Sequence, residues 1–561
     1  MPPVPRIGST YRQLNRYRQI VSVLAKYGFG DLVDRVRLWE HVNVERRLFH
    51  RRDGEFSQLS RAERLRLGLE ELGPTFVKLG QVLSTRSDLL SQDYIGELEK
   101  LQERVPPFPY EAARQIVESE LGRPIGEVFT EFQEVPVAAA SLAQVHRATL
   151  ANGDVVAVKI LRPGVSSVIQ VDVEIMRSLA VLAERYIVEA RPLCPVATVR
   201  EFAANLAKEL DLRTEANHIR RMAYNFADDD TFHSPRVYPE LGNRRVLVME
   251  FIDGINVSNV ERLTAEGYDL KLIARRGVDI VLRSVFEKGF FHADPHPGNV
   301  FILPGNVICF LDYGMMGTVS PRQRESLARL ASSIASGDER GMSRSLEGLA
   351  DAQGPMDVES LEADMSDLAE QYAYLPVSEI RLGEVLNEVM RLLVVHQLRL
   401  QCHLVWLFKA LGTLEDVAHR LQADFDMIEC TKPYAERLMR RRFNPFRQAR
   451  ELYLPALDMV DLVKEFPYAA RDVVRQLREG RLKIESEHIG LEPARKTLDH
   501  VANRLALSIV IAALVVGSSL VVHAKVPPLV AEISIIGIIG YAIAWAFGVW
   551  LMFSILRSGS T

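Results

Sequence analysis

The sequence has few cysteines and no excess of positive charge. Its 561 residues include four widely separated cysteines, and no two of them form a C-x-x-C pair. This scarcity argues against a disulfide-stabilised scaffold, a zinc ribbon and an iron–sulfur cluster. The formal net charge is −5, from 68 basic and 73 acidic residues. Without an overall basic surface, we expect no nucleic-acid partner.

A secretory signal is also missing. The first 30 residues contain no acidic residue and no continuous apolar segment, which a signal peptide would need. Their basic residues are Arg6, Arg12, Arg16, Arg18 and Lys26. Acidic residues return directly afterwards without a cleavage-site pattern, so the composition favours a basic helix near anionic lipid over an organellar transit peptide.

Two long apolar segments lie near the C-terminus. One runs from Leu505 to Ala524 and the other from Ile533 to Leu556. Each is long enough to cross a bilayer core of about 30 Å at about 1.5 Å per residue. The intervening Val526-Pro527-Pro528 breaks the helix and forces a turn. The pattern predicts a transmembrane hairpin, with two buried core helices as the alternative.

Basic residues predict the orientation of this hairpin. Three basic residues, Arg495, Lys496 and Arg504, precede the first apolar segment, and Arg557 follows the second. The link between the two segments contains only Lys525. The positive-inside bias therefore places both ends and the large N-terminal body in the cytoplasm. We expect a bacterial inner membrane rather than an organellar membrane, because the transit signal is weak.

An arginine-rich segment precedes the hairpin. Residues 437–450 contain six arginines interleaved with Phe443 and Phe446. Close to a membrane anchor such a segment fits an anionic lipid surface, at about 1 kcal/mol per basic residue. A solvated helix face is the alternative, and a homodimer face stays equally open.

Two β-hairpins are predicted within a mostly helical body. Residues 143–150 alternate in polarity, Asn152-Gly153 supplies a tight turn, and residues 155–160 continue as a second strand. Residues 301–303 and 307–311 flank a Pro-Gly-Asn turn in the same way.

One lysine lies inside the first predicted hairpin. Lys159 ends the apolar run Val-Ala-Val-Lys, and a buried ammonium group is costly without an anionic partner. A helical stretch downstream contains Glu209, Asp211 and Glu215. Asp211 and Glu215 share a helix face at four-residue spacing, so both are candidate partners.

Two later segments offer oxygen atoms for a metal. A loop braced by proline and glycine carries Asp294 and Asn299, and Asp312 opens the triplet Asp-Tyr-Gly. Asn299 and Asp312 suit Mg²⁺, and Asp294 would lie near a transferring phosphoryl group. His292 and His296 are interpreted as loop-bracing side chains, because imidazole is a poor ligand for Mg²⁺.

The order of these motifs is informative. Each one is common by chance, but lysine, glutamate, D-x₄-N and D-x-G follow one another in the required strand, helix and loop contexts. Together they indicate a protein-kinase-like nucleotide site.

The sequence departs from ordinary kinases in its phosphate loop. No G-x-G-x-x-G precedes the lysine strand, and the corresponding stretch carries Ala138, Ala139, Ala140 and Ser141. Alanine has a Cβ, so this backbone is not expected to adopt the positive φ angles of a glycine loop.

The activation segment is missing as well. Ser320-Pro321-Arg322-Gln323 already indicates a helix start soon after Gly314, and no A-P-E follows. The usual platform for docking a protein substrate is therefore absent.

These departures, together with the motifs, closely resemble the UbiB family of atypical kinases (AarF-like). The resemblance covers about residues 60–430 and is carried by K-L-G-Q at 78–81, the alanine loop at 138–141, V-A-V-K at 156–159, E-L-D at 209–211, H-A-D-P-H-P-G-N at 292–299 and D-Y-G at 312–314. The two C-terminal segments resemble those of bacterial members.

The resemblance implies an α+β fold, namely a protein-kinase-like bilobal fold with a helical N-terminal extension and a C-terminal two-helix transmembrane hairpin. We expect a basic helical region at 1–60, the K-x-G-Q extension at 61–120, an N-lobe at 121–255, a C-lobe at 256–436, membrane-proximal helices at 437–503 and the hairpin at 504–557.

It also implies the binding of ATP and Mg²⁺. Lys78 and Gln81 would belong to a helix that folds over the active site and blocks protein substrates. Lys159 would contact the α- and β-phosphates, with Glu209 or Glu215 as its partner; the sequence does not decide between them. The alanine loop, Ala138 to Ser141, would lie against the nucleotide.

The remaining roles follow from the same resemblance. Asp294 would orient the attacking water or hydroxyl group, and with Lys159 and Lys78 it forms the catalytic set. Asn299 and Asp312 would hold Mg²⁺. Glu250 to Ile252 would form the hinge that touches adenine.

The leading hypothesis is a membrane-bound ATPase that extracts or presents prenyl-quinone precursors for ubiquinone or related biosynthesis. Its expected partners are ATP, membrane lipids, prenyl-quinone precursors and quinone-biosynthesis enzymes. The alternatives are a lipid or small-molecule phosphotransferase, a nucleotide-gated scaffold without catalysis, and a protein kinase acting in trans, which the missing activation segment disfavours.

Overall fold

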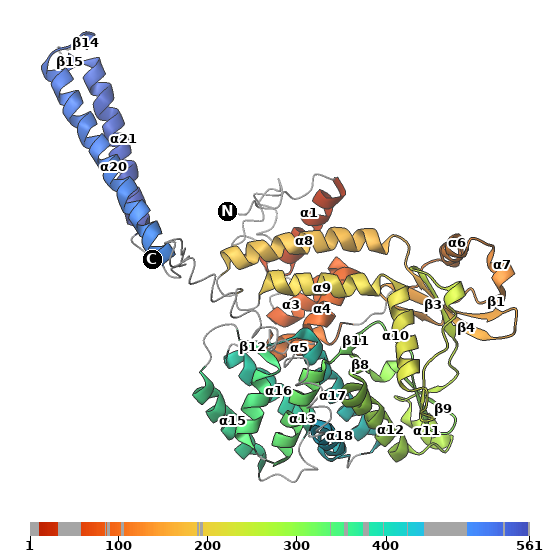
Figure 1. Ribbon diagram of the computed structural model, residues 1–561. Coiled ribbons are helices and arrows are strands. Elements are labelled where there is room, and N and C mark those ends of the chain that lie inside the picture. The colour runs from red at the N-terminus through yellow and green to blue at the C-terminus, as the bar shows by residue number, and fades with distance from the viewer. Residues whose placement is uncertain are drawn as a thin grey trace, which may run out of the picture. The chain divides into compact units, whose positions relative to one another are not determined.

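The structure is a computed structural model of the chain (Figure 1). It describes residues 11–31, 58–84, 86, 90–101, 106–187, 190, 194–336, 338–352, 357–373, 381–396, 398–422, 425–442, 491–530 and 533–558. The chain divides into two compact units, Met1–Gln448 and Ala449–Thr561.

An antiparallel sheet forms the first lobe of the larger unit. Its strand order is β1-β3-β4-β6, with β2 added beside β3. The strands are β1 (Phe129–Phe132), β2 (Ala138–Ala139), β3 (Ala143–Leu150), β4 (Val155–Leu161) and β6 (Val246–Glu250). The predicted first hairpin is confirmed, and its register pairs Val145 with Lys159.

The alternation of β4 decides where its lysine lies. Val156, Val158 and Ile160 belong to a core shared with the short helices α6 (Tyr110–Leu121) and α7 (Ile125–Val128). The intervening residues face the other way, because side chains alternate along a strand. Ala157 and Leu161 pack into the core of the second lobe, and Lys159 lies between them on that face.

The second lobe contains a small sheet and many helices. Its four-stranded sheet has the order β5-β10-β9-β7, and β8 pairs separately with β11. These strands are β5 (Phe232–His233), β7 (Ile255–Asn256), β8 (Phe290–His292), β9 (Val300–Leu303), β10 (Val307–Phe310) and β11 (Met316–Thr318). The β9–β10 pairing confirms the second predicted hairpin.

Helices form the rest of the second lobe. They are α11 (Val260–Ala265), α12 (Leu270–Arg283), α13 (Pro321–Ser336), α14 (Glu339–Glu347), α15 (Val358–Ala373), α16 (Leu382–Val395), α17 (Cys402–Leu421) and α18 (Met427–Arg442). α13 begins as predicted, since Ser320 and Gln323 cap each other, with Ser320 N donating to Gln323 Oε1 (3.0 Å) and Gln323 N to Ser320 Oγ (3.3 Å).

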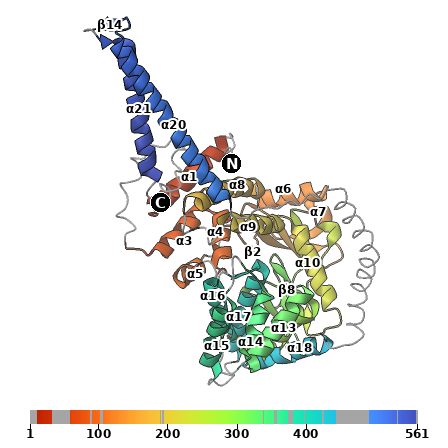
Figure 2. The same cartoon turned by 60° about the vertical axis from the view of Figure 1, so that its left-hand side comes forward.

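A helical layer with its own core covers the lobes. It comprises α1 (Tyr11–Lys26), α3 (Arg61–Leu72), α4 (Pro74–Ser84), α5 (Gln92–Leu98), α8 (Val165–Tyr186) and α9 (Pro195–Glu209), and α10 (Leu212–Asn225) continues from it. The long helices α8 and α9 run side by side in both views (Figures 1 and 2).

Gly80 explains how closely α4 packs in this layer. A Cβ at Gly80 would lie 2.3 Å from Leu101 Cδ1 and 2.9 Å from Leu69 Cδ1. Two leucines thus occupy the space in which a side chain would stand. The glycine of the K-x-G-Q motif is therefore a packing residue that lets α4 lie against α3 and the end of α5.

A buried ion pair joins α1 to α8, and the same arginine contacts the end of α3 and the first turn of α4. Arg16 Nε donates to Asp172 Oδ1 (2.7 Å) and Arg16 Nη2 to Asp172 Oδ2 (3.0 Å). The Arg16 guanidinium also bonds the Leu72 carbonyl (2.6 Å) and lies over the Phe76 ring. The Asp172 side chain is 0% exposed, so Arg16 is the cation that compensates its charge.

The smaller unit contains two long apolar helices, α20 (Leu491–His523) and α21 (Ile535–Ser558). They pack against each other, and Gly537 and Gly540 of α21 approach α20 so closely that a Cβ on either would clash with Val522 or Ser518. Two stretches, Ala502–His523 and Ile535–Met552, are long and apolar enough to cross a membrane. Few of their residues are buried, unlike in a core helix of a soluble domain.

Part of the predicted arginine-rich segment lies outside the described residues, namely residues 443–450. Arg437 lies in the last turns of α18, where its guanidinium stacks on the Tyr434 ring at 4.3 Å. Arg6 at the N-terminus also lies outside the described residues.

We expect Arg16→Ala to destabilise the larger unit by about 3–5 kcal/mol, because it leaves the buried Asp172 carboxylate without its cation. The midpoint of thermal unfolding of the detergent-solubilised chain measures this effect. The double variant Arg16→Leu/Asp172→Leu should lose less stability than Arg16→Ala alone, because it leaves no unpaired charge. If the double variant lost as much stability as Arg16→Leu and Asp172→Leu lose together as single variants, the result would contradict the ion pair.

Candidate functional site

A cavity of about 1180 Å³ lies where the first sheet, the second lobe and the helical layer meet. Every residue predicted from the sequence to bind nucleotide or metal, or to act in catalysis, lines it. These residues are Lys78, Ala138, Ala139, Ala140, Ser141, Lys159, Glu209, Glu215, Glu250, Ile252, Asp294, Asn299 and Asp312. The fold thus brings together residues that are up to 234 positions apart, from 78 to 312.

Lys159 lies between two carboxylates. Its Nζ donates to Glu215 Oε1 at 2.6 Å and lies 3.7 Å from Asp312 Oδ1. The partner that the sequence left open is therefore Glu215, on the first turn of α10. Asp211, the other candidate on that face, instead caps α10 by accepting from Arg213 N (3.1 Å).

Glu209 has a different partner. Its Oε2 lies 3.2 Å from Nζ of Lys78, the lysine of the K-x-G-Q motif on α4. Both side chains are largely buried, at 15% and 14% exposure. Consequently α4 is joined to the end of α9 directly at the wall of the cavity.

The two carboxylates around Lys159 differ in acidity. The charge of Lys159, opposed by burial and aided by the Gly314 N–H, lowers the pKa of Asp312 to about 2. Burial raises the pKa of Glu215, although Lys159 opposes this shift. Burial alone would lower the pKa of Lys159, but the charges of Asp312 and Glu215 outweigh it and the pKa is raised. Asp312 is thus the firmly ionised group; it lines the cavity, and about half of its side chain is exposed.

Histidines hold the loop and the D-Y-G segment in place. His292 Nε2 donates to the Asp312 carbonyl, and His292 Nδ1 accepts from Asp294 N (3.2 Å). Burial lowers the pKa of His292, so its ring is neutral, which agrees with one donor and one acceptor nitrogen. His218 of α10 bonds the Tyr313 carbonyl through Nδ1 (2.9 Å). The interpretation of the loop histidines as braces is confirmed, since His296 Nδ1 also accepts from Gly298 N.

The alanine loop is a short strand rather than an open phosphate loop. Ala138 and Ala139 pair with β3, and no residue of the loop has a positive φ. Arg162 Nε donates to the Ala140 carbonyl at 2.9 Å, and Ser141 is 2% exposed. The backbone on this side of the cavity is therefore held by hydrogen bonds that a mobile glycine loop does not make.

The residues present fit a magnesium ion by the chemistry of their donors. The Asp294 carboxylate and the Asn299 amide have no hydrogen-bond partner among the described residues, and both line the cavity with Asp312. The Asp312 carboxylate and the Asn299 amide oxygen are ligands that Mg²⁺ accepts, and the Asp294 carboxylate lies in the same cavity. Among the described residues, no group of three or more His, Cys, Asp or Glu side chains is placed to hold a metal ion.

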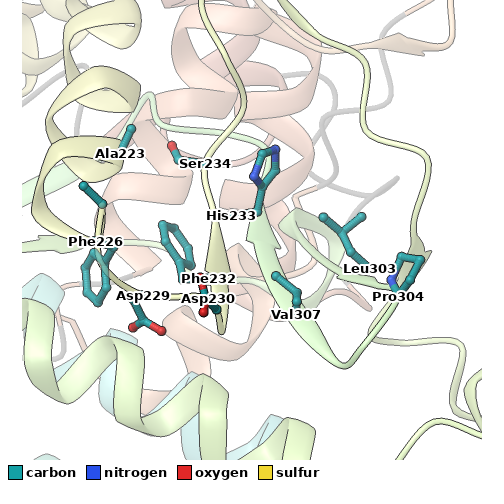
Figure 3. A pocket seen from close by; sticks show the side chains of 11 residues that line it. Ala223, Phe226, Asp229, Asp230, Phe232, His233, Ser234, Leu303, Pro304 and Val307 are labelled. Atoms are coloured by element: carbon teal, nitrogen blue, oxygen red, sulfur yellow. The ribbon is translucent and has the colours of Figure 1, made fainter.

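A second cavity of about 510 Å³ lies beside β5 and the β9–β10 turn (Figure 3). None of the predicted site residues lines it. His233 lines this second cavity and Glu250 lines the first, and a hydrogen bond of 2.9 Å joins His233 Nε2 to Glu250 Oε2. The same carboxylate oxygen accepts from Arg236 N (3.0 Å), so Glu250 already has two hydrogen-bond partners beside this second cavity.

Sequence reasoning missed one group of cavity residues. Trp406, Lys409 and Thr413 of α17 line the larger cavity. Their spacing of three and four residues places them on one helix face. The same spacing occurs in any amphipathic helix, so the sequence contained no signal that would single them out.

Three family models match the sequence. They are the ABC1 atypical kinase-like domain over residues 100–346, the UbiB helical domain over residues 365–426 and the ABC1/UbiB kinase-like C-terminal domain over residues 489–557.

Curated relatives span most of the chain. A protein of Clostridium pasteurianum described as an uncharacterized protein in the hydrogenase 1 5′ region is 33% identical, over 97% of this chain and 99% of its own. The "Probable protein kinase UbiB" of Marinobacter nauticus is 37% identical, over 75% of this chain and 78% of its own. A Mycobacterium tuberculosis protein solved in complex with erythromycin is 23% identical, over 64% of this chain and 90% of its own, with a TM-score of 0.44.

We expect Lys159→Met to destabilise the larger unit by about 3–5 kcal/mol, because Glu215, with a 6% exposed side chain, would lose its cation. Adding Glu215→Gln should recover part of this loss, since the neutral amide needs no counter-charge. Thermal unfolding of both variants checks this prediction. If Glu215→Gln gave no recovery in the Lys159→Met background, Glu215 would not be the principal partner.

The His233–Glu250 pair predicts a pH dependence of stability. The hydrogen bond and charge of Glu250 raise the pKa of His233 above its usual value of 6.5. The pair therefore makes its full contribution to the stability of the fold below about pH 6.5. It loses this contribution as the pH rises through the raised pKa of His233. The unfolding midpoint of wild type minus that of His233→Gln should decrease between pH 6 and pH 8. A difference that is independent of pH would show that His233 does not titrate against Glu250.

Proposed function

The chain belongs to the ABC1/UbiB family of atypical kinase-like proteins, and we propose that it is a membrane-anchored ATPase that supports the biosynthesis of ubiquinone or another prenyl quinone. The observation that carries the proposal is the ion pair of Lys159 with Glu215 and Asp312 inside a cavity that the K-x-G-Q helix α4 also lines. The curated relatives named "Probable protein kinase UbiB" support the choice of this pathway.

Lys159 would bind the α- and β-phosphates of ATP. Its raised pKa keeps the ammonium group charged at neutral pH, and Glu215 holds it from the α10 side. The hinge from Glu250 to Ile252 would receive adenine, and the alanine loop would lie over the phosphates.

Asn299 and Asp312 would hold Mg²⁺. When bound, the ion would neutralise charge on the phosphate oxygens during transfer. Asp312 is suited to this position because its lowered pKa keeps it ionised. Asp294 would orient the attacking water, and the His292 hydrogen bond to its backbone fixes the loop that carries it.

The position of α4 favours water or a small molecule over a protein as the acceptor. Lys78 and Gln81 line the cavity from this helix, and the Lys78–Glu209 ion pair holds it there. No activation segment offers a docking platform, since α13 begins at Pro321, soon after Gly314.

The apolar helices α20 and α21 would anchor the protein as a two-pass hairpin in the bacterial inner membrane, with the kinase-like unit in the cytoplasm. This anchor supports a role in extracting or presenting lipid precursors to quinone-biosynthesis enzymes. A homodimer would be compatible with the same anchor.

One observation favours a second function, a lipid or small-molecule phosphotransferase. The cavity continues past the nucleotide residues to Trp406 and Lys409, so an acceptor could lie in the same space. Transfer of the γ-phosphate to a lipid extract would favour this function, and phosphate released only as the free product would favour the ATPase.

We expect the detergent-solubilised chain to hydrolyse Mg-ATP faster when vesicles containing phosphatidylglycerol are present than with phosphatidylcholine vesicles. Asp312→Asn should lower the rate by about 100-fold or more, because it removes the ionised metal ligand. Phosphate release measures both effects.

The matched control is Asp367→Asn, which changes an exposed aspartate on α15 that does not line the cavity and should hydrolyse at the wild-type rate. If the chain bound nucleotide but hydrolysed none under any condition, the proposed ATPase activity would be wrong. The hypothesis of a nucleotide-gated scaffold would then remain. Equal rates of ATP hydrolysis in the wild type and in Asp312→Asn would contradict the assignment of Asp312 as a metal ligand.

A further inference from the structure

Arg162, the first residue after β4, binds two segments that are distant from each other in the sequence. Its Nε donates to the Ala140 carbonyl of the alanine loop at 2.9 Å, and its Nη2 donates to the Pro106 carbonyl at 2.9 Å. The guanidinium group also lies over the Phe108 ring, 5.6 Å from the ring centroid. One planar side chain thus joins the alanine loop to the segment at 106–108.

The segment at 106–108 is itself held against the first sheet. Phe108 N donates to Oε1 of Gln144 on β3 at 3.0 Å, and Gln144 is 0% exposed. Gln144 Nε2 lies 2.8 Å from His146 Nε2, and His146 Nδ1 lies 2.8 Å from the Gln133 carbonyl. Burial lowers the pKa of His146, so its neutral ring donates to the carbonyl and accepts from the amide. The guanidinium group therefore connects the alanine loop to a segment that buried hydrogen bonds fix on the sheet.

The peptide between Ala140 and Ser141 has one bound side. Both residues line the cavity, whereas Arg162 is not among the described residues that line it. The bound carbonyl is therefore directed to a group outside the cavity lining. In a trans peptide the C=O of one residue and the N–H of the next point in opposite directions, so the Ser141 N–H points away from Arg162.

Ser141 has donors that no protein group uses. The residue is 2% exposed, and neither its N–H nor its hydroxyl group has a hydrogen-bond partner among the described residues. Buried polar groups are nearly always paired, by protein groups or by a bound molecule. A buried residue of the cavity wall with unused donors is suited to bind an anionic oxygen.

We propose that Arg162 is a positioning residue of the nucleotide site. By binding the Ala140 carbonyl it fixes the orientation of the peptide, and the Ser141 N–H then donates to a phosphate oxygen of the nucleotide. The inference rests on the proposed function and deepens it, because it explains how a loop without glycine binds phosphate.

The guanidinium group is required for two physical reasons. Without Arg162 the peptide would be free to rotate and to place the Ala140 carbonyl oxygen near the phosphates, where its partial negative charge is unfavourable. A lysine at this position has a single ammonium group, which cannot reproduce the planar contact that Nε and Nη2 make with two carbonyls.

Isothermal titration calorimetry of the full chain in detergent tests the proposal with Mg-ATP and with adenosine, which has no phosphate. We expect Arg162→Gln to weaken the binding of Mg-ATP at least fivefold and that of adenosine less than twofold, because Arg162 binds the loop and not the hinge. Arg162→Lys should behave in the same way. The matched control is Arg177→Gln, which changes an exposed arginine of α8 that does not line the cavity and should bind both ligands as the wild type does.

A further variant separates positioning from a contribution to stability alone. Phe108→Leu removes the ring beside the guanidinium group but neither of the two hydrogen bonds of Arg162 described above. It should lower the midpoint of thermal unfolding and leave the affinity for Mg-ATP within twofold of the wild type. A loss of Mg-ATP affinity in Phe108→Leu as large as in Arg162→Gln would overturn the proposal, because the affinity would then follow stability.

The two ligands distinguish the remaining outcomes. Equal weakening of Mg-ATP and adenosine in Arg162→Gln would overturn the proposal, since it would show general damage to the site. Unchanged Mg-ATP binding would overturn it as well, and Arg162→Lys provides the same comparison if Arg162→Gln does not fold. A wild type that bound Mg-ATP without hydrolysing it would reject the ATPase, whereas selective loss of Mg-ATP binding in Arg162→Gln would still support the positioning role.

Discussion

The architecture of the site depends on one buried cation. Lys159 points from the first sheet toward the second lobe, where an uncompensated ammonium group would be strongly destabilising. Its two carboxylates come from different places, Glu215 from the helix that follows the covering layer and Asp312 from the end of a strand in the second lobe. One charge therefore joins three parts of the protein, and the cavity keeps its shape because these parts cannot separate without exposing an unpaired group.

A second lysine–glutamate pair repeats this arrangement at the edge of the cavity. Lys78 and Glu209 join the K-x-G-Q helix to the end of α9, and Gly80 lets the same helix lie closely against its neighbours. α4 is thus held both by packing and by charge. This wall of the cavity is therefore fixed in two ways, by side-chain packing and by an ion pair.

Local patterns predicted much of this from the sequence. The alternation in residues 143–161 predicts both the hairpin and the need of Lys159 for an anion, because side-chain direction in a strand depends only on neighbouring residues. The choice between Glu209 and Glu215 was not accessible, since it depends on how α9 and α10 pack against the sheet. Trp406 was not accessible either, because one helix face looks much like another until a cavity is seen beside it.

The Arg16–Asp172 ion pair also has a consequence for synthesis on the ribosome. The two residues are 156 positions apart, so at roughly 5–20 residues per second the arginine emerges about 8 to 30 seconds before its carboxylate. Until α8 appears, α1 has no buried anion to bind, and the start of α4 lacks the side chain that connects it to α8. The helical layer beside the cavity therefore forms completely only after α8, which follows the strand bearing Lys159, has been made.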